Sequence, residues 1–156
     1  MSYNRPVRKD LGDISGRYAI LVGRWNSEVV ENLKTAAVKT LQQYEIHGAD
    51  VDIHYVPGAF EMPLAAQQVA ASGKFKGIIC LGAVIRGDTP HFDFVAGECS
   101  RGLSRVALDH QIPVGFGVLT VDNMQQAVER SGDDEANKGA EATLAVLEMV
   151  GLLRRL

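Results

Sequence analysis

The sequence predicts an α/β fold, a three-layer α/β/α sandwich of flavodoxin-like type with a four-stranded parallel sheet at its centre. Four short apolar runs alternate with segments whose apolar residues recur at helical spacing. The connections between these segments are short, which favours parallel strands with helices on both faces of the sheet. We expect residues 16–156 to form a single domain, preceded by an extended, polar segment at residues 1–15.

The apolar runs predict strands at residues 18–23, 51–56, 77–85 and 113–121. In the second run apolar and polar residues alternate, so we expect Val51, Ile53 and Tyr55 to face inward. The third run contains Cys80, and Cys99 falls on the helix that follows. Two cysteines are too few for a disulfide scaffold, so we expect two free thiols and a cytoplasmic location.

Helical spacing of the apolar residues predicts helices at about residues 26–48, 60–71, 90–110, 124–130 and 136–153. Asn26 offers a capping side chain to the first helix, and Asp122 and Asn123 offer one to the fourth. For the third helix we expect Thr89 as the N-cap and Pro90 at the first helical position.

Composition excludes several classes of protein. The net charge of -3 argues against nucleic acid as a partner, because nucleic-acid binders usually carry a basic face. No apolar run approaches the roughly 20 residues of a membrane span, and the first residues lack the apolar region of an export signal. The histidines show no metal-ligand spacing, so we expect no metal site.

Ligands of such folds bind outside the carboxyl ends of the strands, and this rule brings four polar or aromatic segments together. They are residues 25–26, 57–61, 86–91 and the loop after residue 121. Gly87 permits a tight turn that a side chain would obstruct, and the unpaired N–H groups at the next helix start can receive an anion. His91 beside this turn is either a surface or capping residue or a proton carrier. The second interpretation indicates chemistry on a small phosphorylated molecule.

Other side chains also have two interpretations. Trp25, Phe60 and Phe116 are either packing residues or flat platforms for a heteroaromatic ring. Glu61 stands at a helix start, where the helix dipole favours an acid, but a carboxylate there could equally bind sugar-like hydroxyls.

Arg130 and Lys138 flank a break at Gly132 between the last two predicted helices. Each is either a solvated charge or a group that meets an anion, and the planar fork of arginine suits a phosphate. The acidic run at residues 133–135 is expected to be solvated, and it would repel a phosphate close by.

Taken together, these segments resemble the lumazine synthase family. The resemblance covers nearly the whole chain, from about residue 16 to the C-terminus. The matching stretches are residues 25–26, 56–63, 82–91, 113–120 and 137–142. The Pro-Gly-Ala-Phe-Glu block at residues 57–61 and the Val-Ile-Arg-Gly block that precedes His91 are specific in combination.

The resemblance implies a transferase of riboflavin biosynthesis. Such enzymes condense 5-amino-6-(D-ribitylamino)uracil with 3,4-dihydroxy-2-butanone 4-phosphate to 6,7-dimethyl-8-ribityllumazine, releasing phosphate and water. An amine of the uracil attacks the ketone to give an imine, phosphate leaves by elimination, and the second amine closes the ring. The family needs no metal and no organic cofactor.

The resemblance also implies roles on the pyrimidine side of the site. Trp25 would stack on the pyrimidine, at a position where the family often has phenylalanine. Val84 and Ile85 would offer main-chain groups to the ring. The other residues expected to bind the ring edge and the ribityl chain are Asn26, Ala59, Phe60 and Glu61.

On the phosphate side, the resemblance implies that Gly87, Asp88 and Thr89 form the binding turn, with Arg130 as the counter-charge. His91 would be the catalytic residue that moves a proton near the leaving phosphate. Many family members have a small neutral residue in place of Asp88, so we expect its carboxylate to point away from the phosphate.

The resemblance further implies a homo-oligomer whose active site lies at a subunit interface, with Phe116 and Lys138 supplied by the neighbouring subunit. Icosahedral family members usually carry Gly-Thr-Lys-x-Gly-Asn where this chain has residues 132–137, Gly-Asp-Asp-Glu-Ala-Asn. This difference favours a pentamer, or at most a pair of pentamers, over an icosahedral shell of about 60 subunits.

A second function remains open from the sequence, a non-catalytic protein of the same fold that binds flavin or lumazine, for which Trp25 would favour stacking. Retention of His91, Arg130 and Lys138 argues for catalysis, because a protein that only binds its ligand would not need all three. A flavodoxin-like carrier of flavin mononucleotide is less favoured, because the first strand is not followed by the Ser/Thr/Gly-rich phosphate loop expected of one.

Overall fold

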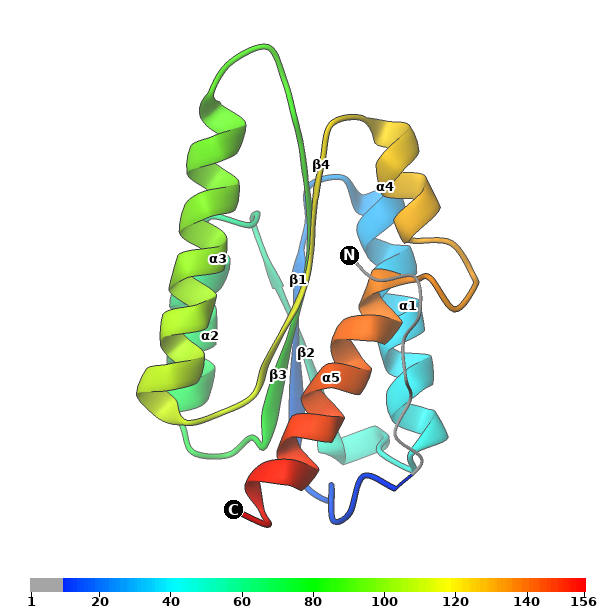
Figure 1. The fold of residues 1–156 in the computed structure, drawn as a ribbon, viewed down its shortest axis with the longest axis vertical. Coiled ribbons are helices and arrows are strands. Elements are labelled where there is room, and N and C mark those ends of the chain that lie inside the picture. The colour runs from blue at the N-terminus through cyan, green and yellow to red at the C-terminus, as the bar shows by residue number, and fades with distance from the viewer. Residues whose placement is uncertain (1–9) are drawn as a thin grey trace.

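The computed structural model describes residues 10–156 and confirms a four-stranded parallel sheet between two layers of helices (Figure 1). The sheet has the spatial order β2-β1-β3-β4. The strands are β1 (Tyr18–Gly23), β2 (Val51–Val56), β3 (Gly77–Ile85) and β4 (Val114–Val121). The helices are α1 (Ser27–Gln43), α2 (Met62–Ala71), α3 (His91–His110), α4 (Met124–Arg130) and α5 (Lys138–Leu153), with a short 3-10 helix η1 (Gly48–Asp50).

Helices α2 and α3 cover one face of the sheet, and α1, α4 and α5 cover the other (Figure 1). Successive side chains of a strand point to opposite faces, so the strands feed two separate apolar clusters. On β1, Ile20 and Val22 pack with α1 and α5, whereas Leu21 packs with α2 and α3. Burial on both faces explains why the central strands have continuous apolar sequences.

The predicted bounds of β1, β2 and β3 are confirmed, and β4 begins one residue later than predicted. The first helix ends at Gln43 rather than near Gly48, because Glu45 adopts a left-handed backbone with φ 62°. The predicted cap of α4 is confirmed, since the side chain of Asn123 accepts a hydrogen bond from the N–H of Gln126.

Three further helices begin later than predicted. The helix α2 begins at Met62 rather than near residue 60. The helix α3 begins at His91, so Pro90 is its N-cap and Thr89 lies one residue before the cap. The helix α5 begins at Lys138, because the buried side chain of Asn137 accepts hydrogen bonds from two N–H groups of its first turn. Residues 132–136 therefore form a linker rather than a helix start.

The prediction that Ile53 and Tyr55 face inward is wrong. These side chains are 40% and 50% exposed, because among residues 10–156 β2 pairs only with β1 and forms one edge of the sheet. The hydroxyl of Tyr55 instead hydrogen-bonds to Glu31 and Lys34 on α1. Alternating polarity shows which residues share a face, but not whether another element covers that face.

Residues 10–16 precede the sheet and pack against the end of α5. Leu11 is buried in the core, and its carbonyl accepts a hydrogen bond from Arg155 at 3.3 Å. Asp13 forms an ion pair with Arg154. The first nine residues of the predicted extended segment 1–15 lie outside the described residues.

Both cysteines are free, as predicted, and both are buried in the cluster that α2 and α3 form with the sheet. Burial raises the pKa of Cys99 to about 11 and also raises that of Cys80. The thiolate, which is the reactive form of cysteine, is therefore scarce at neutral pH.

The contact between α1 and α5 depends on a residue without a side chain. A Cβ atom at Gly139 would lie 2.2 Å from the carbonyl oxygen of Leu33 in α1. Backbone atoms in a helix cannot easily move aside, so the two helices could not approach this closely with any larger residue.

Replacing Gly139 with alanine is therefore expected to lower the free energy of unfolding by about 1–3 kcal/mol, the usual cost of overpacking a core. Urea unfolding measures this difference. Gly97→Ala on α3 is the matched control, because its Cβ would meet only the flexible guanidinium of Arg101 and alanine is the better helix former. A Gly139→Ala protein as stable as the wild type would contradict the close contact.

Candidate active site

The register of the sheet places the carboxyl ends of three strands side by side. Gly23 at the end of β1 pairs with Val56 at the end of β2. On the other side of β1 lies β3, which continues beyond it to Ile85. The segments that follow these strands therefore emerge at one edge of the sheet, as the sequence predicts.

Trp25 lies at this edge, directly after β1, with 65% of its surface exposed. Part of its ring rests on the loop after β2, where a Cβ atom at Gly58 would lie 3.1 Å from the ring atom Cε3. Gly58 thus allows the indole to lie against the backbone of residues 57–61. The uncovered part of the ring is a flat apolar surface beside this loop.

Asn26 has a different role from the predicted cap of α1. Its side chain makes no capping hydrogen bond, and its backbone is left-handed, with φ 56° and ψ 45°. Its Nδ2 instead donates to the carbonyl oxygen of Ala83 in β3 at 3.0 Å. Asparagine tolerates this backbone better than most residues. The side chain therefore ties the loop after β1 to the neighbouring central strand.

The other residues predicted on the pyrimidine side differ in exposure. Phe60 and Glu61 are exposed, just before α2. Ala59 is 6% exposed and its side chain packs in the core, so only its main chain can face a ligand. Val84 and Ile85 are half-buried at the end of β3.

The turn between β3 and α3 is exposed throughout residues 86–91. Thr89 Oγ1 accepts a hydrogen bond from the N–H of His91 at 3.4 Å, so Thr89 supports the helix start without being its N-cap. The predicted reason for Gly87 is wrong: its backbone is not left-handed, and a Cβ atom there would meet no atom within 4 Å. The space beside its main chain is open, which allows a ligand to approach, and Asp88 is exposed beside it.

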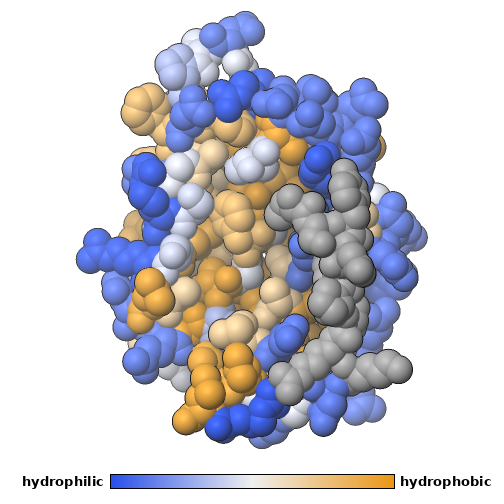
Figure 2. All heavy atoms as spheres, in the orientation of Figure 1, coloured by the Kyte–Doolittle hydropathy of each residue, from blue (hydrophilic) through white to orange (hydrophobic). Residues whose placement is uncertain are grey.

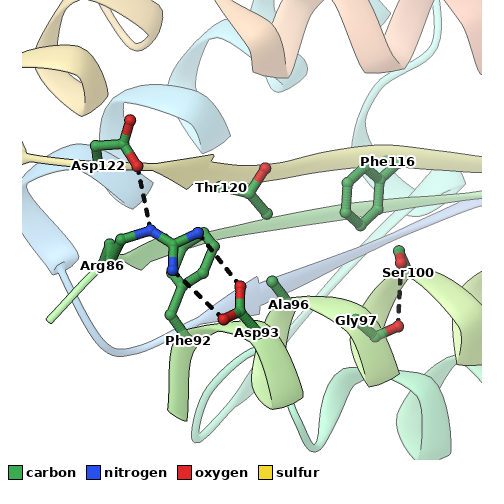
Figure 3. A pocket seen from close by; sticks show the side chains of 9 residues that line it. All are labelled: Arg86, Phe92, Asp93, Ala96, Gly97, Ser100, Phe116, Thr120 and Asp122. Atoms are coloured by element: carbon green, nitrogen blue, oxygen red, sulfur yellow. Dashed lines mark hydrogen bonds and ion pairs between the residues drawn. The ribbon is translucent and has the colours of Figure 1, made fainter. Parts of the chain in front are cut away.

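Arg86, at the beginning of this turn, is the centre of a cluster that sequence reasoning missed (Figure 3). Its Nη2 lies 3.2 Å from Oδ1 of Asp93 in the first turn of α3, and its Nε lies 3.2 Å from Oδ1 of Asp122 after β4. The guanidinium carbon lies 4.1 Å from the ring centroid of Phe92. The sequence does show that Arg86 directly follows β3 and that Asp122 directly follows β4.

Phe116 and Lys138 lie on different faces of the sheet, Phe116 beside α3 and Lys138 at the start of α5, next to α1. Phe116 is 44% exposed on β4, the edge strand opposite β2, and it lines an open pocket of about 430 Å³ together with the Arg86 cluster (Figure 3). Lys138 begins α5, which crosses the backbone of β4 at Gly115, and it pairs with Glu141.

Arg130 is the last residue of α4. Its Nη1 donates to the carbonyl oxygen of Gln126 at 3.0 Å and lies 3.7 Å from a carboxylate oxygen of Glu129. Within the described part of the chain, these contacts all stay on α4.

A parallel sheet of this kind binds ligands outside its strand ends, so the fold and this edge define an α/β enzyme that acts on small molecules. Comparison with protein-family models narrows the class, because the model described as 6,7-dimethyl-8-ribityllumazine synthase matches residues 15–154. The chain belongs to this family.

Membership gives the activity, the transferase reaction of riboflavin biosynthesis that makes 6,7-dimethyl-8-ribityllumazine from two small-molecule substrates, and it implies an oligomeric assembly. Between residues 10 and 156, no helix is long and apolar enough to cross a membrane. The same residues contain no group of three or more His, Cys, Asp or Glu side chains arranged to hold a metal ion.

Replacing Asn26 with alanine is expected to lower the free energy of unfolding by about 2 kcal/mol, because it removes the bond to Ala83 and forces alanine into a left-handed backbone. Asn26→Gly is the matched control, since it loses the same bond without the backbone penalty and should cost about 1 kcal/mol. Thermal unfolding compares the two. Equal stability of both variants would show that the left-handed backbone at residue 26 does not affect the free energy of unfolding.

Proposed function

We propose that the residues at the carboxyl edge of the sheet form the lumazine-forming site, with the turn at residues 86–91 receiving the phosphorylated substrate. One observation carries this assignment: Trp25, the loop at residues 57–61 and this turn emerge together, and the bond from Asn26 to β3 holds two of them in place. Two substrates can therefore be held side by side. Positioning is a large source of catalysis when two molecules must react.

On the pyrimidine side, Trp25 and Phe60 supply aromatic surface, and Glu61 supplies acceptors for the ribityl hydroxyls. The Nδ2 of Asn26 is already bonded to Ala83, so we assign its Oδ1 to the ligand. The residues whose main-chain groups we assign to the ring are Ala59, Val84 and Ile85.

On the phosphate side, we assign binding to the main chain of Gly87, Asp88 and Thr89. The open space beside Gly87 and the start of α3 directly after the turn support this assignment. Arg130 is the proposed counter-charge. Since its contacts in one chain stay on α4, we infer that it acts across a subunit interface.

His91 is the proposed proton carrier. It is exposed as the first residue of α3, directly after the phosphate turn. Once the uracil amine has formed an imine with the ketone, a proton must leave the carbon skeleton as the phosphate departs. An imidazole at this position can take that proton near neutral pH. The non-catalytic alternative has no supporting observation among residues 10–156.

We also infer that Phe116 and Lys138 complete the site of a neighbouring subunit. Phe116 is exposed on the edge strand β4, and Lys138 begins α5 on the other face of the sheet. Figure 2 shows hydrophobic side chains gathered over the middle of one face of the molecule, framed by hydrophilic ones, as expected of a contact surface.

The proposed assembly is a single pentamer, or at most a pair. The linker between α4 and α5 carries three exposed acidic residues, at positions 133–135. If pentamers met through this linker, these carboxylates would repeat around each contact and repel one another. The same linker is fixed by Asn137, whose Nδ2 donates to the carbonyl of Gly132 at 2.8 Å.

Two further assignments accompany this proposal. We infer one domain at residues 16–156, supported by its single sheet, with residues 1–15 attached as an extended segment. We infer a cytoplasmic location, supported by the two free thiols.

Replacing His91 with alanine is expected to lower kcat by about 10²- to 10⁴-fold, the usual contribution of a general acid or base. The KM for the pyrimidine should stay the same, because His91 lies at the phosphate end of the site. Formation of the fluorescent lumazine from both substrates measures the rate. The exposed His47, replaced in the same way, is the control and should leave the rate unchanged; an unaltered rate in His91→Ala would remove it from the mechanism.

Light scattering of the purified protein is expected to give a mass near five times the 16.9 kDa of one chain, or twice that value for paired pentamers. Exchange of residues 133–136 for Thr-Lys-Ala-Gly, which removes the three carboxylates and gives the pattern of the icosahedral family members, would then be expected to promote larger particles. A wild-type mass near that of an icosahedral shell would contradict the proposed assembly.

A further inference from the structure

The turn that is proposed to bind phosphate has no packing of its own. Residues 87–90 are all exposed, so apolar burial cannot hold them in one conformation. Its shape must therefore be set by the contacts at its two ends, the last residues of β3 and the first turn of α3.

Arg86 connects these two ends directly. Its backbone N–H donates to the carbonyl oxygen of Val121 at 2.9 Å, which fixes the start of the turn to β4. Its guanidinium then reaches forward to both carboxylate oxygens of Asp93, at 3.2 Å and 3.5 Å, two residues after His91. Figure 3 shows the guanidinium between Asp93 and Asp122, with the ring of Phe92 against it.

This arrangement differs from an ordinary exposed ion pair, which contributes little. The planar fork of arginine contacts both oxygens of one carboxylate, donates through Nε to a second carboxylate and lies over an aromatic ring. Lysine cannot make this set of contacts, because its ammonium group is a point charge without a fork. The hydrogen bonds to Asp93, and more weakly to Asp122, raise the pKa of Arg86.

We propose that Arg86 is a positioning residue for the reaction: it holds the first turn of α3 against the ends of β3 and β4, and so sets the place of the phosphate turn and of His91. Arg86 does not touch the substrates. This inference rests on the proposed function of the turn, and it extends that function to a residue outside the binding surface.

The test replaces Arg86 with lysine, which keeps the charge and removes the fork. The kcat is expected to fall about ten- to a hundredfold, the effect of displacing a reacting group by about 1 Å. The KM for the butanone phosphate and the inhibition constant of inorganic phosphate should both rise, whereas the KM for the pyrimidine stays unchanged. Arg105→Lys is the matched control, because Arg105 pairs with Asp109 at 3.1 Å near the other end of α3 and should change none of these values.

Asp93→Asn provides a second test that keeps Arg86 in place. This variant should lower kcat and raise the KM for the butanone phosphate and the inhibition constant of inorganic phosphate, as Arg86→Lys does. In the double variant the loss of activation free energy should be smaller than the sum of the losses in the two single variants, because both changes break the same contact. An unchanged Arg86→Lys enzyme, an equal rise of both KM values, or additive losses would overturn the proposal. If Arg86→Lys fails to assemble, the Asp93→Asn constants decide it.

Failure of the proposed role of His91 would be distinguishable from failure of this inference. If His91→Ala leaves turnover unchanged, His91 is not the proton carrier. The rise in the inhibition constant of inorganic phosphate in Arg86→Lys would still show that Arg86 shapes the turn.

Discussion

The pairing of β1 with β3 is the constraint on which the rest of the molecule depends. All of β1 and residues 77–83 of β3 are buried on both faces. A buried N–H or C=O group without a partner costs free energy, and a slip of one residue would turn every side chain to the wrong face. The register is therefore fixed, and with it the place where each loop leaves the sheet.

The sequence was sufficient to predict the central strands β1 and β3, because burial on both faces requires uninterrupted apolar runs. It was less informative about helix starts, since Asn26 and Thr89 are residue types that cap helices but here make other contacts. The exposure of β2 was not predictable from alternation, because spacing along one strand does not reveal the order of strands in the sheet.

The candidate site, too, could be predicted from the sequence only in part. The loops after β1, β2 and β3 could be grouped from the sequence, because parallel strands present their carboxyl ends on one side. The contacts of Arg86 could not, since grouping the loops does not reveal that one side chain reaches both Asp93 on α3 and Asp122 after β4. The position of Phe116 on the edge strand β4 likewise required the order of the strands.

The burial of both cysteines has a practical consequence. Their sulfur atoms lie between the sheet and the helices α2 and α3, in a form that resists deprotonation. A cysteine engineered onto the surface would thus be the preferred target of maleimide dyes, and the two native cysteines would not need to be replaced first. Fluorescent reporters of subunit exchange or of loop motion can be attached to this protein in its natural background.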